Sequence, residues 1–254
     1  MAVLTGVRVG GSGLALEAIT RAPGVQKVVV IFSDGSAHRR NIGRLIRKIW
    51  KIGPLGALNG IRMRRWFGAA AAKDVLAEAE RLGVEVHIVP SVNSPATEAL
   101  MRSLNLDLGI SLGNGFIASR IFTIPRLGMI NYHGELLPDY PGALSIIWPI
   151  HDRRRETGFT IHRVARKIDG GDIILQRRFP IVFGRRLRDT VELTGATIHP
   201  HIGEAFSEVL GNWDTLSAQA IPQDNQKSFT TPSIWQYARM IINNRFYYKS
   251  GQDY

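Results

Sequence analysis

The chain has 254 residues, with 32 lysines and arginines against 21 aspartates and glutamates, and no cysteine. This length can bury the core of one large domain with a small appendage, and the lack of cysteine excludes disulfides, thiolate metal sites and cysteine nucleophiles. The formal net charge of +11 favours acidic partners such as phosphorylated substrates, nucleic acid or anionic lipid. The N-terminus has no signal-peptide pattern and no stretch is apolar enough to span a membrane, so we expect a soluble, cytoplasmic protein.

The first half of the chain alternates short apolar runs with helical patterns, which is typical of parallel strands joined by crossover helices. Strands are expected in three apolar runs, at residues 27–32, 84–89 and 106–113. Helices are expected between and around them, at residues 14–21, 70–82 and 95–104. A first strand near residues 2–10 would contain a glycine. The pattern predicts an open, mostly parallel, twisted α/β sheet of Rossmann-like type.

A glycine cluster lies where the first strand would turn into the first helix. Exposed backbone N–H groups at such a turn can hold a phosphate, so Gly11, Ser12 and Gly13 are candidate substrate-binding residues. The spacing departs from Gly-x-Gly-x-x-Gly, and a plain tight turn is the favoured interpretation over a phosphate site. In an open sheet this turn lies at the ligand-binding edge in either case.

A basic segment follows the strand expected at 27–32. From His38 to Lys73 there are ten lysines and arginines and no acidic residue. Apolar residues between Ile42 and Trp50 recur at helical spacing with basic residues on the other face, which predicts a basic amphipathic helix. Three interpretations remain open: a packed helix with a solvated basic face, a surface for an acidic substrate, or a contact with an anionic membrane.

The stretch NYHGELLP, at residues 131–138, begins the most informative region. Three further pieces follow in order: YPG at 140–142, TIH at 160–162 and DGG at 169–171. In these pieces the chain resembles the folate-dependent formyltransferase family. The catalytic domain of that family carries Asn-x-His-x-x-Leu-Leu-Pro, a Tyr-Pro-Gly or Arg-Gly turn, a Thr-Ile-His strand and an Asp-x-Gly loop. The resemblance covers about residues 100–210, whereas the N-terminal third agrees only in layout.

The resemblance implies catalysis by Asn131, His133 and Asp169. Moving a formyl group from N10 of a folate to an amine builds a tetrahedral carbon with an oxyanion, which preorganised donors must stabilise. Asn131 and His133, two apart on an extended segment, can donate to one oxygen. Asp169 can keep His133 protonated and hold a water that relays a proton. His162 is implied as buried support for the Asp169 loop, no metal is needed, and Glu135 would put a charge near the site.

The resemblance also implies 10-formyltetrahydrofolate as the co-substrate. In this family the pterin slot is formed by the loop after the 106–113 strand and by the loop before the catalytic aspartate. The matching positions are Gly113, Asn114, Gly115, Phe116, Ile117 and the run from Ala165 to Ile168. Phe116 and Ile117 would pack against the pterin. Tyr140, in the turn after the catalytic histidine, is a further candidate substrate-binding residue.

The expected organisation is a catalytic domain at residues 1–210, with the basic insertion at about 36–70, and a C-terminal extension at 211–254. The closing RFYYKSG predicts a strand or hairpin edge that contacts the domain or the second subunit of a homodimer. The initiator methionyl-tRNA formyltransferases of this family carry a longer C-terminal barrel that helps to grip tRNA. The extension expected at 211–254 looks too short for such a barrel, so full tRNA is not the expected acceptor.

The expected activity is transfer of a formyl group from 10-formyltetrahydrofolate to the primary amine of a small, phosphorylated or nucleotide-linked substrate, for example an amino sugar nucleotide. One alternative is hydrolysis of the same folate. Another is a non-catalytic membrane-binding or nucleic-acid-binding protein that acts through the basic segment. The sequence leaves the identity of the acceptor amine open.

Overall fold

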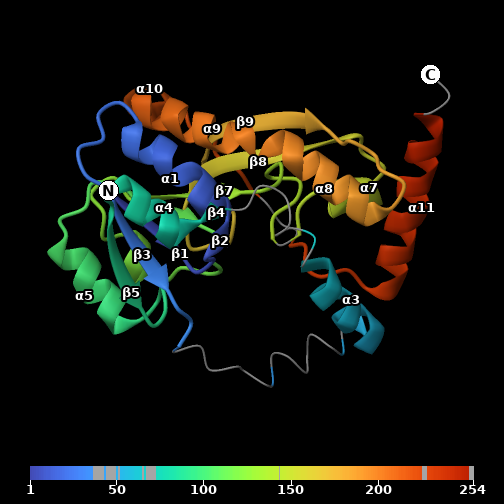
Figure 1. Cartoon of the computed structure of the whole chain (residues 1–254), viewed down its shortest axis with the longest axis horizontal. Helices are drawn as coiled ribbons and strands as arrows, with labels where there is room; N and C mark the ends of the chain where they lie inside the picture. Colours follow the sequence, from blue (N-terminus) through green and yellow to red (C-terminus); the bar gives the residue numbers. More distant parts are fainter. Residues whose placement is uncertain are drawn as a thin grey trace.

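The computed structural model describes residues 1–36, 43, 50, 52–64, 66, 73–142, 144–224 and 228–251. Its centre is a seven-stranded sheet (Figure 1). In order across the sheet, the strands are β5 (Glu85–Val89), β3 (Val29–Ser33), β1 (Ala2–Thr5), β6 (Gly109–Leu112), β7 (Met129–His133), β8 (Glu156–Arg163) and β9 (Ile173–Pro180). The strands from β5 to β7 are parallel, and β8 and β9 continue the sheet antiparallel. The predicted open, mostly parallel α/β sheet is confirmed.

Helices cover both faces of the sheet. In chain order they are α1 (Gly11–Arg21), α3 (Pro54–Arg64), α4 (Val75–Leu82), α5 (Pro95–Ser103), α6 (Ser119–Phe122), α7 (Ile147–His151), α8 (Leu187–Ile198), α9 (Pro200–Gly211), α10 (Trp213–Ala218) and α11 (Ile234–Ser250). On β1, Val3 packs towards α1, α4 and α9, whereas Leu4 packs towards α5 and α6. Successive residues of a strand point to opposite faces, so strands covered on both sides read as continuous apolar runs.

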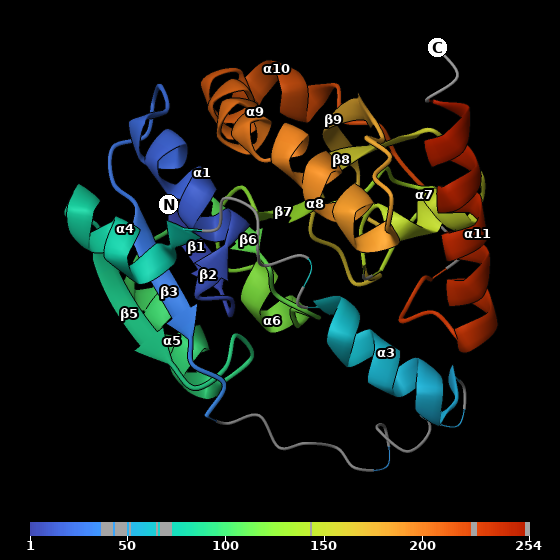
Figure 2. The same cartoon turned by 45° about the vertical axis from the view of Figure 1, so that its right-hand side comes forward.

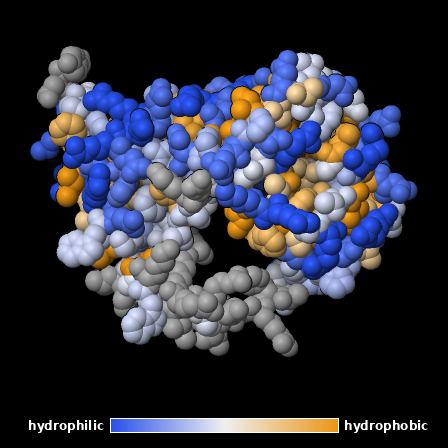
Figure 3. Space-filling model, turned by 180° about the vertical axis from the view of Figure 1, so that it is seen from behind, coloured by the Kyte–Doolittle hydropathy of each residue, from blue (hydrophilic) through white to orange (hydrophobic). Residues whose placement is uncertain are grey.

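A third apolar cluster lies beyond β8, where α3, α7, α8 and α11 meet. Met63, Trp148 and Met240 belong to it. Both cartoon views place α3 and α11 at the end of the molecule opposite α4 and α5 (Figures 1 and 2). From behind, hydrophilic residues cover most of the surface and hydrophobic ones form separate patches (Figure 3). Within the described part of the chain, no helix is both long and apolar enough to cross a membrane.

The prediction of a strand or hairpin at the C-terminus is wrong, because RFYYKS belongs to the helix α11. The sequence does carry a start signal for this helix. The Ser233 hydroxyl accepts from the Gln236 N–H, and the Gln236 side chain accepts from the Ser233 N–H at 2.8 Å, which is a capping box. Met240 and Asn244, four residues apart on the buried face, then anchor the helix. Whether this element also joins two subunits stays a prediction.

The glycine cluster allows two backbone segments to approach closely. The chain turns after β1, forms the short strand β2 (Val9–Gly10) beside β4 (Lys73–Asp74), and enters α1. A Cβ on Gly13 would lie 2.5 Å from the Lys73 carbonyl oxygen.

The helix predicted between Ile42 and Trp50 lies almost entirely outside the described residues.

Candidate functional site

The strand β7 carries the two predicted oxyanion donors to the carboxyl edge of the parallel strands. Asn131 pairs in register with His162 on β8, and His133 pairs with Thr160. Ligands of open α/β sheets bind at this edge. The register therefore brings the Asn-x-His segment and the Thr-Ile-His strand together, although they are about thirty residues apart in the sequence.

Asp169 meets both histidines from the loop between β8 and β9. Its Oδ2 lies 3.7 Å from His133 Nδ1, and its Oδ1 lies 3.7 Å from His162 Nε2. The backbone N–H of Gly142 donates to Oδ2 at 2.8 Å. Asp169 has a φ of 51°, in the left-handed region that aspartate tolerates better than most residues. The structure thus brings the three predicted catalytic residues to one place.

His162 is buried and fixes the Asn131 amide. Its Nδ1–H donates to the Arg163 carbonyl at 2.8 Å, which leaves Nε2 as an acceptor for Asn131 Nδ2 at 3.2 Å. Burial lowers the pKa of His162 to about 4, against the opposing attraction of Asp169. A neutral His162 can therefore accept one amide hydrogen of Asn131 and leave the other free for a ligand. Support of the Asp169 loop by His162, as the resemblance implies, stays a prediction.

The two ring nitrogens of His133 have different partners, and Nδ1 is the one that lies beside Asp169. Its Nε2 lies 2.7 Å from the Tyr140 carbonyl oxygen, to which it donates. The Tyr140 ring itself packs against Phe229, with ring centroids 5.3 Å apart, and is buried in the third apolar cluster. The Tyr140 side chain, predicted to bind substrate, is thus buried, and the backbone carbonyl of this residue fixes the His133 ring.

A cavity of about 380 Å³ opens above these residues, and both predicted folate loops line it. One wall holds Gly113, Asn114, Gly115, Phe116 and Ile117, and the other holds Ala165, Lys167, Ile168 and Asp169. The side chains of Phe116 and Ile168 are exposed at the rim. The Asn114 amide donates to the Leu4 carbonyl at 2.7 Å, so this side chain anchors its loop. Of the nine positions predicted to bind the folate, all except Arg166 line this one cavity, together with Asn131, His133 and Asp169.

Two residues that the sequence did not single out hold the cavity walls. Asn93 donates to the Phe116 carbonyl at 2.8 Å and accepts from the Ala118 N–H at 2.7 Å. Gln223 donates to the Asp169 and Gly171 carbonyls at 3.0 and 2.6 Å. Neither belongs to a motif, because each acts on a loop that is distant in sequence. Ser228, Phe229 and Thr230 also line the cavity, so the predicted C-terminal extension contributes to the site.

The glycine turn lies beside a second, smaller cavity. Gly11 lines this space of about 170 Å³ together with Tyr132, Gly134 and Ser145. Ser12 is buried, and its hydroxyl bonds to that of Thr5 at 3.1 Å. Of the three turn residues predicted to bind substrate, Gly11 lines this cavity, whereas Ser12 and Gly13 pack the turn against its neighbours.

Glu135 does not put a charge into the site, because the residue is only 2% exposed and its carboxyl is bonded inside the protein. Its Oε1 accepts from the Thr157 hydroxyl at 2.8 Å and from the Ile146 N–H, and its Oε2 accepts from the Leu136 N–H at 3.2 Å. Burial raises the pKa of Glu135 to about 7, against the opposing effect of these hydrogen bonds. Ile146 has a φ of 70°, which is uncommon for a β-branched residue. Glu135 therefore braces the turn before α7.

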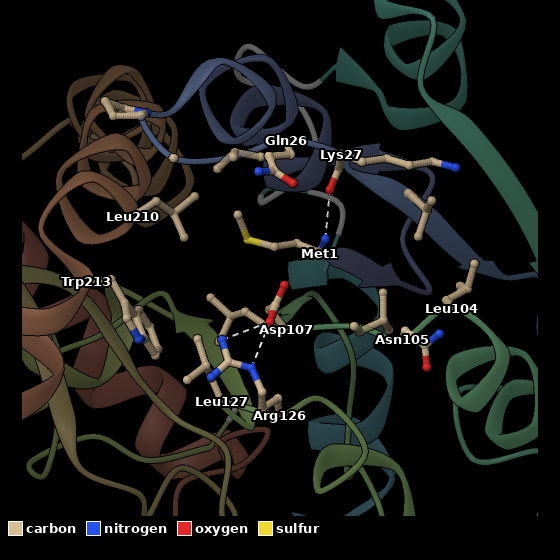
Figure 4. Close-up of a pocket in the computed structure, with 16 residues that line it drawn as sticks. Met1, Gln26, Lys27, Leu104, Asn105, Asp107, Arg126, Leu127, Leu210 and Trp213 are labelled. Carbon is tan, nitrogen blue, oxygen red and sulfur yellow. Dashed lines mark hydrogen bonds and ion pairs between the residues drawn. The ribbon is translucent and has the colours of Figure 1, made fainter.

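Another cavity, of about 460 Å³, lies at the opposite edge of the sheet, where the parallel strands begin (Figure 4). Its charged side chains include Arg126 and Asp107, which pair with each other at 2.9 Å. None of the predicted catalytic residues lines it. The convergence of Asn131, His133 and Asp169 therefore marks the carboxyl-edge cavity as the candidate active site.

The comparisons with known proteins concern mainly the region that holds this site. A family model described as formyl transferase matches residues 90–210. The methionyl-tRNA formyltransferase of Microcystis aeruginosa is 33% identical over 154 residues, which cover 57% of this chain and 46% of that protein. That of Ehrlichia canis is 31% identical over 177 residues, covering 69% and 54%. The chain spans about half the length of these curated relatives.

Solved structures share the fold at low sequence identity. Phosphoribosylglycinamide formyltransferase from Bacillus halodurans superposes with a TM-score of 0.57 at 18% identity, covering 84% of this chain and 94% of that one. An N-formyltransferase from Helicobacter canadensis, in complex with folinic acid and dTDP-3-aminofucose, gives 0.55 at 18% identity, covering 92% and 71%. The match at residues 90–210, which contains Asn131, His133 and Asp169, places this region in the formyl transferase family, and the solved structures show that the fold is shared.

Proposed function

We propose that this protein is an N-formyltransferase that moves the formyl group of 10-formyltetrahydrofolate to the primary amine of a small, phosphorylated or nucleotide-linked acceptor. One observation carries the proposal: Asn131, His133 and Asp169 converge at the base of a cavity whose walls are the two expected folate loops. The match of residues 90–210 to the formyl transferase family supports it.

The cavity fits the folate in size and in lining. Its volume of about 380 Å³ falls within the usual range for ligand pockets. The exposed Phe116 and Ile168 side chains on facing walls can cover a planar ring, and backbone groups of Gly113 and Gly115 are available to its edge. When bound there, the folate supplies the formyl group that is transferred.

The side chains at the base can stabilise and deprotonate the reacting groups. One Asn131 amide hydrogen is directed at His162, so the other is available to the formyl oxygen. His133 Nε2 is engaged by the Tyr140 carbonyl, which leaves Nδ1, beside Asp169, to face the substrate. Asp169 is placed to accept the proton that the amine loses as the new C–N bond forms, and to pass it to folate N10 as the bond between the formyl carbon and N10 breaks.

The acceptor class rests on charge. A net charge of +11 favours an anionic substrate. The curated relatives are methionyl-tRNA formyltransferases, of which the chain spans about half, so methionyl-tRNA belongs among the acceptors to be tested. Amino sugar nucleotides and phosphorylated amines complete the panel.

The test is to mix the purified protein with 10-formyltetrahydrofolate and each acceptor, and to follow the folate absorbance. His133→Ala should lower turnover at least about 100-fold, the scale expected when an oxyanion donor is lost. His201→Ala is the matched control, because His201 lies on α9 and bonds to Glu204 at 2.8 Å. Near wild-type turnover in His133→Ala would reject the assigned site. Folate cleavage at the same rate without any amine would instead identify a hydrolase.

A further inference from the structure

A strongly basic cavity of about 570 Å³ lies where α3, α8 and α11 approach one another. Three separate parts of the chain contribute its arginines. These are Arg62 on α3, Arg185, Arg186 and Arg188 around the start of α8, and Arg245 on α11. We refer to this space as the arginine cavity. None of the residues that line it is acidic.

Most of these arginines have no acidic ion-pair partner among the residues that the structure describes. Arg188 is the exception, because it pairs with Glu192 at 2.7 Å. Within the part of the chain that the structure describes, no aspartate or glutamate forms an ion pair with Arg62, Arg185, Arg186 or Arg245. Like charges held around one hollow create a positive potential that attracts anions. Guanidinium groups bind phosphate oxygens through paired N–H donors, so phosphate is the anion that suits them best.

The floor of the arginine cavity is aromatic and packed. Trp66 is buried, and its ring lies 6.4 Å from that of Tyr237. The guanidinium of Arg62 lies over the Trp66 ring, 5.9 Å from its centroid. Tyr237 and Ile241 also line the space, on the face of α11 that points into the protein. This lining can hold a phosphate together with an apolar or planar group, as in a nucleotide.

Shared lining residues link the arginine cavity to the candidate active site. Trp66 lines both the arginine cavity and the smaller cavity beside the glycine turn. Tyr132 lines both that smaller cavity and the folate cavity, next to Asn131 and His133. Neighbouring spaces therefore share one lining residue each, from the arginines to Asn131 and His133.

We propose that the arginine cavity binds the phosphate groups of the formyl acceptor, whose amine reaches the catalytic residues through the smaller cavity. This inference rests on the proposed function and narrows its acceptor to a phosphate-bearing amine such as an amino sugar nucleotide. A diphosphate offers more oxygens to several arginines than a single carboxylate does, so a nucleoside diphosphate group is the favoured anchor.

Binding can be measured without any acceptor in hand. Isothermal titration with inorganic pyrophosphate and with a nucleoside diphosphate is compared between the wild type and an Arg185→Gln/Arg245→Gln double variant. Losing two charge-assisted contacts should raise Kd at least about 10-fold. Arg21→Gln/Arg102→Gln is the matched control, because both arginines are exposed on distant helices and the charge change is equal. Circular dichroism checks that each variant is folded.

The outcomes separate this inference from the proposed function. Pyrophosphate binding that is lost in the arginine-cavity variant and kept in the control variant would support the anion site. If the wild type showed this binding but transferred no formyl group to any acceptor, the anion site would stand and the transferase would be rejected. Formyl transfer with an unchanged acceptor KM in that variant would keep the transferase and overturn the arginine cavity. An absence of binding by either probe at millimolar concentration, or equal binding by both double variants, would also overturn it. If the arginine cavity bound a short RNA tightly but did not bind pyrophosphate, its ligand would be a nucleic acid and the proposed small acceptor would be wrong.

Discussion

Replacing Glu135 by glutamine tests how the interior beside the catalytic strand depends on pH. The carboxyl is 2% exposed, and burial raises its pKa from the ordinary 4.5 to about 7. The folded protein therefore holds this proton more tightly than the unfolded chain does. As pH rises from about 4.5 to 7, the unfolded state loses the proton first, so the contribution of Glu135 to stability falls.

The expected size follows from the two pKa values. A pKa raised from 4.5 to about 7 corresponds to about 3 kcal/mol, since each pH unit is worth about 1.4 kcal/mol. Below pH 4.5 the glutamate of the wild type and the glutamine of the variant are both neutral. The variant then loses only the hydrogen bond from the Leu136 N–H, because the amide nitrogen of glutamine cannot accept it. Above pH 7 the wild type also bears the cost of the buried charge.

The assay is urea denaturation of the wild type and Glu135→Gln between pH 4 and 8. The other titrating groups cancel in the difference between the two free energies of unfolding. We expect the wild type minus the variant to fall by about 3 kcal/mol over this range. Glu80→Gln, at an exposed position on α4, should give a flat difference. A difference that rises with pH would show that the three hydrogen bonds outweigh burial, which would refute the reasoning.

Two further substitutions test the supports of the site and of α11. Gln223→Ala removes both hydrogen bonds to the Asp169 and Gly171 carbonyls. The Asp169 loop should then be less well positioned, so kcat should fall about 10-fold with little change in melting temperature. An unchanged kcat would show that the loop keeps its conformation without Gln223. Asn244→Ala should lower the free energy of unfolding by about 2 to 3 kcal/mol, because the buried amide accepts from Thr190 at 2.6 Å and donates to Gly184 at 3.0 Å. Ile242→Ala, exposed on the same helix, should stay within about 0.5 kcal/mol in the same denaturation assay, and equal losses in the two variants would contradict the role of Asn244.

The layout of the sheet could be predicted because local pattern carries it. β3 and β6 lie inside the sheet between helices on both faces, so residues 27–32 and 106–113 read as continuous apolar runs. Residues 84–89 also read as an apolar run, although β5 lies at the edge of the sheet and is only partly covered. Asn131 and His133 could be paired as candidate donors because an extended segment repeats every two residues. The C-terminal helix was missed because RFYYKS has the aromatic composition of a strand, and its Ser233–Gln236 start signal lies well upstream.

The tertiary structure alone decided what meets at the site. Asn131 faces His162 because β7 and β8 pair antiparallel in one register, and a shift by one residue would separate them. Gln223 reaches the Asp169 loop, and Arg245 joins Arg62 and Arg185 around one cavity, only after distant segments pack together. Periodicity describes the contacts of a residue with its near neighbours along the chain. Contacts between segments depend on which buried faces fit each other, so the partners of these side chains emerge only from the packed fold.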